Sequence, residues 1–404
     1  MLGALGLGAM LKTERLYYND SYLREFEAQV LGVEPAPPHF RIYLDRTAFY
    51  PESGGQPMDR GTLGGFLVLQ VSEEHDAVVH LVERELPLGL VKGLIEWPRR
   101  FDHMQQHTGQ HLLSAAFEKV GEAKTVSFHL GAETSTIDLD SDRLGRRQME
   151  QAEELANQLI FEDRPVHIIY CDATEANQMD LRKPIGRAGE VRVVEVEGFD
   201  RSACGGTHVS RTGAIGLLLL RKIEKRKDQT RVEFVCGLRA LRHAWQDYQV
   251  LTKAAGLFST AAENVPALIA QQAEDLRGAR RSREKLLERL SEYRARELCA
   301  SAPERNGVKV VRLIFAAEEN LEAKLLAHAV AKQPSAVALM GVKGKPAALF
   351  FSQSSGGPHD MGAILKQTLA RVGGKGGGAR DFAQGGGLDE NKLEDALAIA
   401  EELV

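Results

Sequence analysis

The chain has 404 residues, which is too long for one compact hydrophobic core, so we expect two or three domains. Apolar residues make up 43% of it and charged residues 26%, as in ordinary globular proteins, and its net charge of −5 argues against nucleic-acid binding over the whole surface. No run of about 18 apolar residues occurs, so we predict no membrane-spanning helix.

The first ten residues, MLGALGLGAM, are apolar, but they have no basic segment before them and no cleavage site after them. They do not make a signal peptide, and we expect a disordered start with Met10 as an alternative initiation site. The irregular spacing of the four cysteines argues against a disulfide framework and for a reducing, cytoplasmic environment. These cysteines are Cys171, Cys204, Cys236 and Cys299.

Residues 1–100 are predicted to form a small antiparallel, barrel-like β domain. Short strand-like segments alternate there with Pro- and Gly-rich breaks such as EPAPP and PESGGQP. The period then changes, and residues 103–119 follow the repeat of an amphipathic helix with Leu113 and Phe117 on its apolar side.

Residues 101–240 mix strand and helix patterns and predict an α+β domain. The strand-like runs are TVSFHL, STIDLD, VHIIYC and VRVVEVEG, and an acidic helix is expected from about Gln148 to Phe161. Two further strands, AIGLLLLRKIEKR and TRVEFVCG, can form a hairpin across Lys227 and Asp228.

Residues 241–302 are predicted to be a helical connector with a break near GLFSTAAENVP. One heptad register through its second helix places apolar residues at most of the a and d positions. Position a holds Ile269, Leu276, Arg283, Leu290 and Glu297, and position d holds Gln272, Ala279, Leu286, Tyr293 and Ala300. Packing against the same domain and formation of a homodimer are equally open interpretations of this stripe.

Residues 303–404 alternate strands and helices and predict an α/β domain with an uneven charge. Between Arg305 and Arg380 there are eleven lysines and arginines but only four acidic residues. From Asp381 onward there are seven acidic residues and one lysine. A basic block of this kind favours a polyanion as its partner.

Two short motifs contain candidate metal ligands. In DHMQQHTGQHLL, His103, His107 and His111 recur every four residues, so they lie near one face of the predicted helix. Two imidazoles one turn apart can chelate a single ion. SACGGTHVS adds Cys204 and His208, and three histidines with one cysteine suit Zn²⁺. We therefore predict a zinc site with His103 outside its ligands.

Either motif alone is more often structural than metal-binding, so the prediction depends on their combination. Two classes of zinc enzyme are excluded. A zincin needs Glu directly after the first histidine as its general base, and Thr108 stands there. A nucleobase deaminase needs H-x-E with P-C-x-x-C, and both motifs are missing from the sequence.

The motifs resemble those of a known family. HTGQHLLSAAF, followed along the chain by CGGTH, is similar to the editing domain of alanyl-tRNA synthetases and of the free-standing AlaX proteins. RTAFYPESGGQPMDRG resembles the glycine-rich segment of the small β domain ahead of that editing core, and RVEFVCGLRAL resembles its end. GGKGGGARDFAQGGG is similar to the signature of the DHHA1 domain that ends alanyl-tRNA synthetases. Because the aminoacylation and helical domains of a synthetase are not seen ahead of the β domain, the chain looks like a long AlaX protein.

This resemblance implies an α+β fold with four parts: a β-barrel-like domain, a zinc-containing editing domain, a helical connector and a DHHA1-like domain. It implies Zn²⁺ bound by His107, His111, Cys204 and His208. The reaction would be hydrolysis of the ester between serine, or glycine, and the 3′ adenosine of tRNA(Ala). AKTVSFHLG matches the segment that lines the family's amino-acid pocket, and its candidate substrate contacts are Thr125, Ser127 and His129.

The glycine-rich block is the candidate tRNA contact, because glycine lets backbone amides approach phosphate or ribose closely. Its candidate residues are Lys375, Gly376, Gly377, Gly378, Arg380 and Gln384. A flexible, acid-capped loop is the alternative interpretation of this block.

The role of the metal stays open between two mechanisms. Four protein ligands describe a closed structural site, whereas catalytic zinc keeps one position open. Either one ligand is replaceable, or the ion organises the pocket while neighbouring groups position water. The absence of a prominent carboxylate in the motifs favours positioning.

Two other functions remain as alternatives. One is a hydrolase for another mischarged tRNA, and the other is a non-catalytic RNA-binding protein with structural zinc. A DHH phosphoesterase is excluded, because the sequence contains no Asp-His-His tripeptide.

Overall fold

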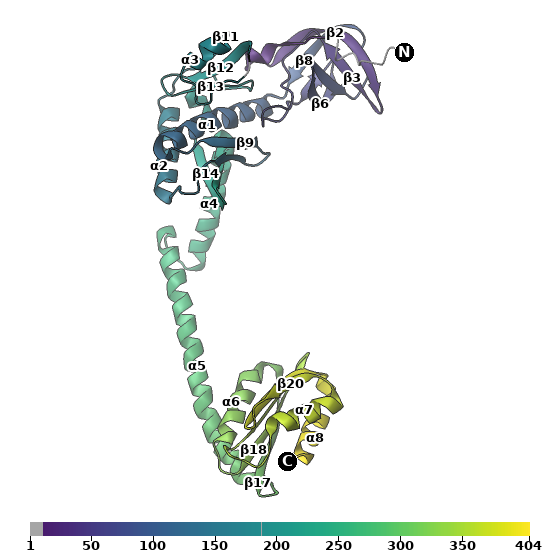
Figure 1. The fold of residues 1–404 in the computed structure, drawn as a ribbon, viewed down its shortest axis with the longest axis vertical. Helices are drawn as coiled ribbons and strands as arrows, with labels where there is room; N and C mark the ends of the chain where they lie inside the picture. The colour runs from purple at the N-terminus through teal and green to yellow at the C-terminus, as the bar shows by residue number, and fades with distance from the viewer. Residues whose placement is uncertain (1–10, 187) are drawn as a thin grey trace. The chain divides into compact units, whose positions relative to one another are not determined.

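The computed structural model describes residues 11–186 and 188–404, so the apolar start that we expect to be disordered lies outside the described residues. The chain divides into two compact units, Met1–Lys253 and Ala254–Val404, each with its own hydrophobic clusters (Figure 1). Helices and strands occur in both units, which confirms the expected mixed α+β class. In the part of the chain that is described, no helix is long and apolar enough to cross a membrane.

The first unit opens with a closed barrel of antiparallel neighbours in the order β2-β3-β7-β6-β5-β8. Its strands are β2 Glu25–Ala36, β3 His39–Leu44, β5 Gly61–Leu63, β6 Phe66–Glu74, β7 Ala77–Val82 and β8 Gly89–Ile95. Burial alternates along β2, so that Phe26 and Val30 point into the barrel while Glu27 faces outward. The two-residue strands β1 Glu14–Arg15 and β4 Arg46–Thr47 pair with each other in parallel.

The central helix of this unit is α1, Trp97–Gly121, which begins directly after the last barrel strand. Pro98 lies in its first turn, where a missing N–H is tolerated, and Glu122 ends it in the left-handed region at φ 51°. Every residue from His103 to Phe117 is buried. The helix predicted over residues 103–119 is therefore present, but it is not amphipathic with one side in solvent. Its polar side faces other elements of the unit.

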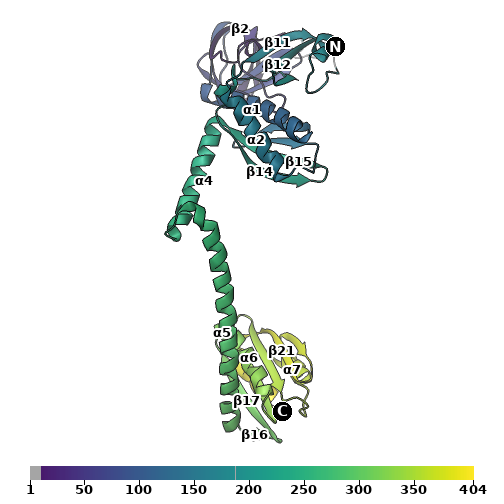
Figure 2. The same cartoon turned by 90° about the vertical axis from the view of Figure 1, so that its left-hand side faces the viewer.

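Two sheets and several helices complete the first unit (Figure 2). One sheet has the antiparallel order β14-β15-β10-β9 and the other the antiparallel order β11-β12-β13. The strands are β9 Thr125–Leu130, β10 Ser135–Leu139, β11 Val166–Asp172, β12 Glu190–Val196, β13 Asp200–Ala203, β14 Leu218–Arg226 and β15 Gln229–Cys236. The helices are α2 Arg146–Phe161, α3 Ala173–Gln178 and α4 Gly237–Leu257, with the 3₁₀ turns η2 Leu16–Tyr18 and η3 Thr212–Ile215. As expected, β14 and β15 form a hairpin that turns at Lys227 and Asp228.

The second unit contains a six-stranded sheet of order β16-β17-β18-β19-β21-β20, in which β17 and β18 are parallel and the other neighbours antiparallel. The strands are β16 Glu304–Arg305, β17 Val308–Phe315, β18 Ala336–Val342, β19 Ala347–Gln353, β20 Lys375–Gly378 and β21 Phe382–Leu388. The helices are α5 Val265–Ser301, α6 Asn320–Ala331, α7 Met361–Val372 and α8 Leu393–Glu402, with η4 Ala262–Asn264, η5 Ala317–Glu319 and η6 Glu390–Lys392. Helices α7 and α8 pack on one face with Val310 and Leu339, and α5 and α6 pack on the other with Val311 and Met340.

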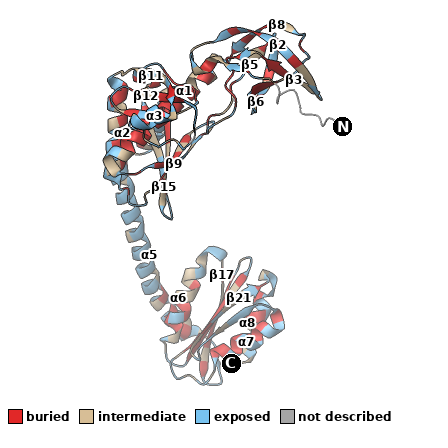
Figure 3. Cartoon of the chain, turned by 45° about the horizontal axis from the view of Figure 1, so that its top comes forward, coloured by how far each residue is buried: buried red, intermediate tan, exposed pale blue. Residues whose placement is uncertain are grey.

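Helix α5 packs within its unit through a face other than the predicted heptad stripe. Near its C-terminal end, Ala295 and Cys299 are buried against α6. The large apolar residues at positions a and d stay exposed, and most of the helix is solvent-facing (Figure 3). These residues are Ile269, Leu276, Leu286, Leu290 and Tyr293. The heptad stripe therefore does not hold α5 against its own unit, and a homodimer remains the untested interpretation.

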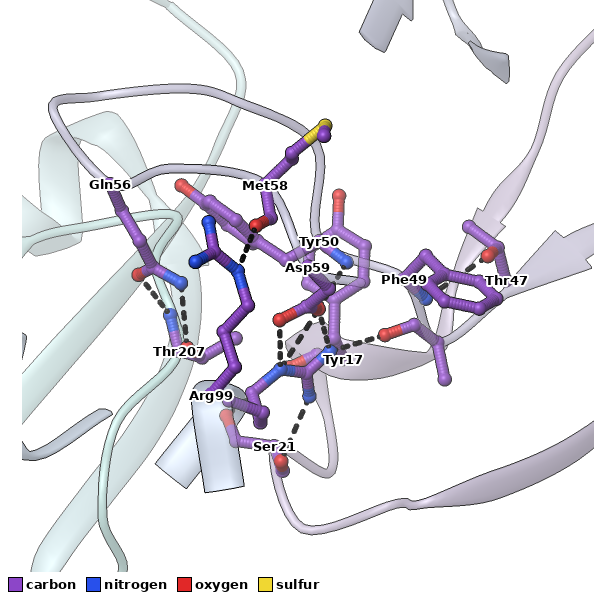
Figure 4. A network of polar contacts seen from close by, with 12 residues as sticks. Tyr17, Ser21, Thr47, Phe49, Tyr50, Gln56, Met58, Asp59, Arg99 and Thr207 are labelled. Atoms are coloured by element: carbon purple, nitrogen blue, oxygen red, sulfur yellow. Dashed lines mark hydrogen bonds and ion pairs between the residues drawn. The ribbon is translucent and has the colours of Figure 1, made fainter. Parts of the chain in front are cut away.

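A buried ion pair joins the barrel to α1 (Figure 4). Arg100, in the first turns of the helix, and Asp59, in the loop before β5, are both fully buried. Nε of Arg100 donates to the two carboxylate oxygens of Asp59 at 3.0 and 2.9 Å, and its Nη1 donates to the carbonyl of Ser21 at 2.9 Å. Asp59 also accepts the backbone N–H of Tyr50 at 2.7 Å. Each polar group of the pair is thus satisfied, and the loop over residues 48–59 is fixed against the helix.

Replacing Asp59 by Asn should strongly destabilise the first unit, because it leaves the Arg100 guanidinium buried without a counter-charge. We expect the free energy of unfolding to fall by about 3–5 kcal/mol. Urea denaturation followed by tryptophan fluorescence measures this unit selectively, since Trp97 and Trp245 are the two tryptophans of the chain and both lie in it.

A matched control is Glu150→Gln, which removes the partner of Arg146 on the exposed side of α2. This exposed pair should contribute nothing measurable to the free energy of unfolding. Equal destabilisation by the two substitutions would contradict the structural role of the buried pair.

Candidate functional site

The structure brings the four predicted metal ligands together. His107 and His111 lie one turn apart on α1, Cys204 follows the end of β13, and His208 lies after the Gly-Gly-Thr turn. The ligand atoms of the four all lie within 4.8 Å of one another. Sγ of Cys204 is 3.4 Å from Nε2 of His107 and 3.3 Å from Nε2 of His208. His103 is buried on the same helix but lies outside this cluster.

The hydrogen bonds of Gln56 set the tautomer of His107. The side-chain N–H of Gln56 donates to Oγ1 of Thr207 at 2.9 Å, and its carbonyl oxygen accepts the backbone N–H of Thr207 at 3.2 Å (Figure 4). That oxygen lies 2.8 Å from Nδ1 of His107 and therefore accepts the proton on Nδ1. The lone pair of His107 is left on Nε2, the atom that faces Cys204.

Thr108 sets the tautomer of His208 in the same way. Its hydroxyl donates to the carbonyl of Met104 at 2.9 Å, so its oxygen must accept from Nδ1 of His208 at 3.1 Å. Nδ1 of His111 lies 3.4 Å from the carboxylate of Asp200. His107 and His208 thus have hydrogen-bond acceptors at Nδ1 and leave Nε2 for the cluster, the arrangement that orients metal-binding histidines in proteins. Nδ1 of His111 lies beside Asp200 but makes no hydrogen bond among the described residues.

Glycine is required where the two motifs meet. A Cβ at Gly206 would lie 2.2 Å from Cε1 of His107, so no larger residue fits between the CGGTH turn and the helix. On the other side of α1, a Cβ at Gly109 would lie 2.3 Å from Sγ of Cys236 on β15. The two glycines therefore allow α1 to approach both the turn and the sheet.

Cys204 and His208 have the protonation states that a metal requires. Burial opposes protonation of His111, whereas the neighbouring Asp200 and Cys204 raise its pKa. Burial opposes ionisation of the Cys204 thiol, but the neighbouring His107 and His208 lower its pKa well below the usual value. Burial lowers the pKa of His208 to about 3, so its ring is neutral. A thiolate and neutral imidazoles are the forms that bind a divalent ion. Three nitrogen donors and one sulfur donor therefore fit a borderline-soft metal.

A cavity of about 730 Å³ opens beside the cluster. His107, His111 and Cys204 lie in its wall, and so do Thr125 and Ser127 of strand β9. The third residue predicted to line the pocket does not: His129, two residues farther along β9, is exposed and pairs with Thr136 beyond the cavity. The strand passes the cavity before it reaches that position.

The two hydroxyl groups on β9 are held in place by partners. Oγ1 of Thr125 donates to Oγ of Ser114 on α1 at 2.6 Å. Oγ of Ser127 donates to the carboxylate of Asp138 at 2.6 Å, and Arg231 pairs with that carboxylate at 2.7 Å. The Arg231 guanidinium lowers the pKa of Asp138 to about 2, so Asp138 is a constant acceptor at neutral pH.

Several residues of the site escaped the sequence analysis. Gln110, inside HTGQH, lines the cavity and donates to Ser114 at 2.8 Å. Arg192 is buried within the apolar run of β12 and donates to the carbonyls of Cys204 and Gly206 at 2.6 and 3.1 Å, which holds the CGGTH turn. A charged residue inside a buried strand was the available signal for Arg192. Gln56 and Asp200 gave no such signal, because their partners are distant in sequence.

The glycine-rich segment is a β-hairpin at the sheet edge and not a loop. Lys375, Gly376 and Gly378 on edge strand β20 are exposed, and Gly377 is half-buried; Arg380 in the turn and Gln384 on β21 are exposed. A Cβ at Gly376 would lie 2.5 Å from Cα of Gly385 on the partner strand. Close packing between the strands, and not free backbone movement, therefore requires glycine at that position.

Comparison with family models gives two matches. Residues 191–233 match the threonyl and alanyl tRNA synthetase second additional domain, and residues 305–404 match the DHHA1 domain. The first range contains Cys204 and His208, and the second covers the sheet of the second unit from the end of β16 onward.

Similar whole proteins are known in several organisms. The chain is 32% identical to alanyl-tRNA editing protein AlaX-L of Pyrococcus horikoshii, over 96% of this chain and 98% of that protein. It is 29% identical to alanine–tRNA ligase of Methanobrevibacter smithii, over 97% of this chain but only 46% of the ligase. It is 37% identical to alanyl-tRNA editing protein Aarsd1-A of Xenopus laevis, over 57% of this chain and 60% of that protein.

Removing the partner of His107 should weaken metal binding without removing a ligand. In Gln56→Ala, Nδ1 of His107 loses its acceptor, so the ring no longer has a fixed tautomer. We expect the affinity for Zn²⁺ to fall by about 10–100-fold, measured by competition with a chromogenic chelator. Gln70→Ala, at an exposed position of β6, should leave the affinity unchanged. An unchanged affinity in Gln56→Ala would show that this hydrogen bond does not orient a metal ligand.

Proposed function

Since the chain belongs to the family of alanyl-tRNA editing proteins, we propose that it deacylates tRNA(Ala) mischarged with serine, or with glycine, in the cytoplasm. The observation that carries this proposal is the cluster of His107, His111, Cys204 and His208, of which all but His208 lie in the wall of a cavity. This cavity is large enough for an aminoacyl ester with part of its nucleotide. The similarity extends over nearly the full length of an editing protein, AlaX-L.

Zn²⁺ is the metal that we propose for the cluster, because three imidazole nitrogens and a thiolate suit it. When bound, it can polarise a carbonyl group and lower the pKa of water. Other residues of the chain give the site its rigidity: Gln56 and Thr108 fix the rings of two of the histidines, and Arg192 fixes the turn that carries Cys204.

The residues of the chain contribute to the reaction mainly by positioning the ester and a water molecule. An aminoacyl ester is already activated, so its hydrolysis needs a water molecule and the ester carbonyl held in reacting geometry. Among the described residues that line the cavity, Glu190 is the one carboxylate, and it is exposed to solvent. We do not assign the role of general base to it. The cavity wall acts instead by orienting the ester.

Selectivity against alanine follows from the fixed hydroxyl groups of the cavity. Thr125 and Ser127 offer oxygen atoms whose positions are set by Ser114 and Asp138. A seryl hydroxyl can donate to one of these oxygen atoms, whereas alanine would leave that acceptor position without a hydrogen bond. Discrimination of this kind reaches about 10⁴. It also favours serine over glycine as the substrate, because glycine has no hydroxyl group.

We assign tRNA binding to the second unit. Its exposed lysines and arginines include Lys375 on the edge strand and Arg380 in the hairpin turn. An edge strand presents unpaired backbone N–H groups, and β20 presents them between small side chains. Gly376, Gly377 and Gly378 would accept a phosphate at this edge, with Gln384 exposed on the neighbouring strand.

The deacylation reaction tests the proposed function. We expect the wild-type protein to hydrolyse seryl-tRNA(Ala) and to spare alanyl-tRNA(Ala) in parallel time courses. Cys204→Ala should lower the seryl rate by about 100-fold or more, because it removes one donor of the cluster. Cys299→Ala, at a free cysteine of the second unit, is the matched control and should retain the rate. If the protein hydrolyses neither ester but still binds tRNA, the result would favour the alternative of a non-catalytic RNA-binding protein.

The tRNA assignment has a separate test. Lys375→Ala should weaken binding of uncharged tRNA(Ala). It should also reduce the slope of the logarithm of the binding constant against the logarithm of the salt concentration by about one. Lys227→Ala, at the exposed turn of β14 and β15, serves as the control for the loss of a surface charge. Equal effects of the two substitutions on the salt dependence would contradict a specific contact at β20. The measurement is filter binding at several salt concentrations.

A further inference from the structure

A second cavity lies against the first. It has a volume of about 550 Å³ and is bounded by the N-terminal segment around Lys12 and Arg15. Tyr18, Tyr170 and Glu190 line both cavities, so they form the boundary between them. A ligand that fills the first cavity and extends beyond it on this side must pass these residues.

The two tyrosines of the boundary differ in what their rings contact. The ring of Tyr18 already has partners, because the guanidinium of Arg15 lies 5.5 Å and that of Arg192 lies 5.4 Å from its centroid. Tyr170, on β11, is 42% exposed, and its hydroxyl lies near the Arg192 side chain. No other ring stacks on its ring and no guanidinium or ammonium lies over it among the described residues. Its hydroxyl donates to the side chain of Asn19 at 3.1 Å, which orients the ring. Tyr170 is therefore an oriented aromatic surface with a free face.

The charges around the second cavity favour an aromatic ligand with few phosphates. Lys12 is exposed and makes no ion pair within the described residues, whereas Arg15 is paired with Glu73 at 2.9 Å. Acidic groups also line this cavity, and they include Asp76. A lining of mixed sign cannot attract a dense polyanion, but it can accept a base by stacking and one phosphate at a lysine.

We propose that Tyr170 binds the nucleotide next to the terminal adenosine of a single-stranded RNA 3′ end by stacking on its base. This assignment depends on the proposed function, since it places the aminoacyl group and terminal adenosine in the first cavity. The first cavity, at about 730 Å³, lies within the range of about 300–1,000 Å³ that holds ligands of that size. The chain then crosses the Tyr18–Tyr170 boundary, and the next base meets the free face of Tyr170.

The experiment compares two esters of different length, seryl-adenosine and the seryl ester of the trinucleotide CCA. The wild-type kcat/KM should be higher for the trinucleotide ester by about tenfold or more, because stacking on an aromatic side chain adds to binding. Tyr170→Ala should lose this advantage, so that the ratio of the two kcat/KM values approaches one. Tyr170→Phe should keep the ratio, because it retains the ring. Phe161→Ala, an exposed aromatic residue of the same unit that lines neither cavity, should also keep it.

An unchanged ratio in Tyr170→Ala, or a wild-type ratio near one, would overturn the assignment. If the wild-type protein hydrolyses neither ester, the proposed function fails, and binding then decides the assignment independently. Fluorescence anisotropy with labelled, uncharged CCA measures that binding. Tyr170→Ala should weaken it by about tenfold relative to Tyr170→Phe, and equal affinities of the two variants would overturn the stacking proposal.

Discussion

The buried pair of Asp59 and Arg100 is the interaction on which the first unit depends. It fixes the loop over residues 48–59 to the start of α1, and the same loop carries Gln56 to His107 and Thr207. Arg99 adds a second polar contact between α1 and this loop, because its Nε donates to the carbonyl of Met58 at 3.1 Å. The barrel is thus part of the site and not an appendage to it, although none of its residues is a predicted ligand.

The metal cluster shows how buried imidazole nitrogens obtain hydrogen-bond partners. Histidines can face a common point only if their outward nitrogens have acceptors, because a buried N–H without a partner is unfavourable. Here Gln56, Thr108 and Asp200 lie at Nδ1 of the three rings, and the first two have their own donors committed elsewhere. This ordered set of hydrogen bonds selects one tautomer for His107 and His208. A divalent ion would therefore find Nε2 of both rings unprotonated.

In the second unit, glycine allows two strands to pack closely as well as leaving the sheet edge accessible to a ligand. The hairpin of β20 and β21 brings Gly376 and Gly385 so close that a side chain on Gly376 would collide with the partner strand. The resulting edge is narrow, with Lys375 and Arg380 at its ends. An edge built in this way can present backbone groups and positive charge together, which is the combination suited to a phosphate.

The sequence by itself determined most of the element types, the hairpin turn at Lys227, and the candidate ligands in HTGQH and CGGTH, but not the strands of the glycine-rich segment. These depend on local periodicity and on spacing within one helix or turn, which the chain order already fixes. Tertiary structure decided the rest: that α1 is buried on all sides, that His129 leaves the cavity, and that Gln56 and Arg192 support the cluster. Those facts depend on contacts between residues far apart in sequence. Local patterns do not encode these contacts, even where one marks a residue such as Arg192, because each hydrogen bond has its other end on a different element.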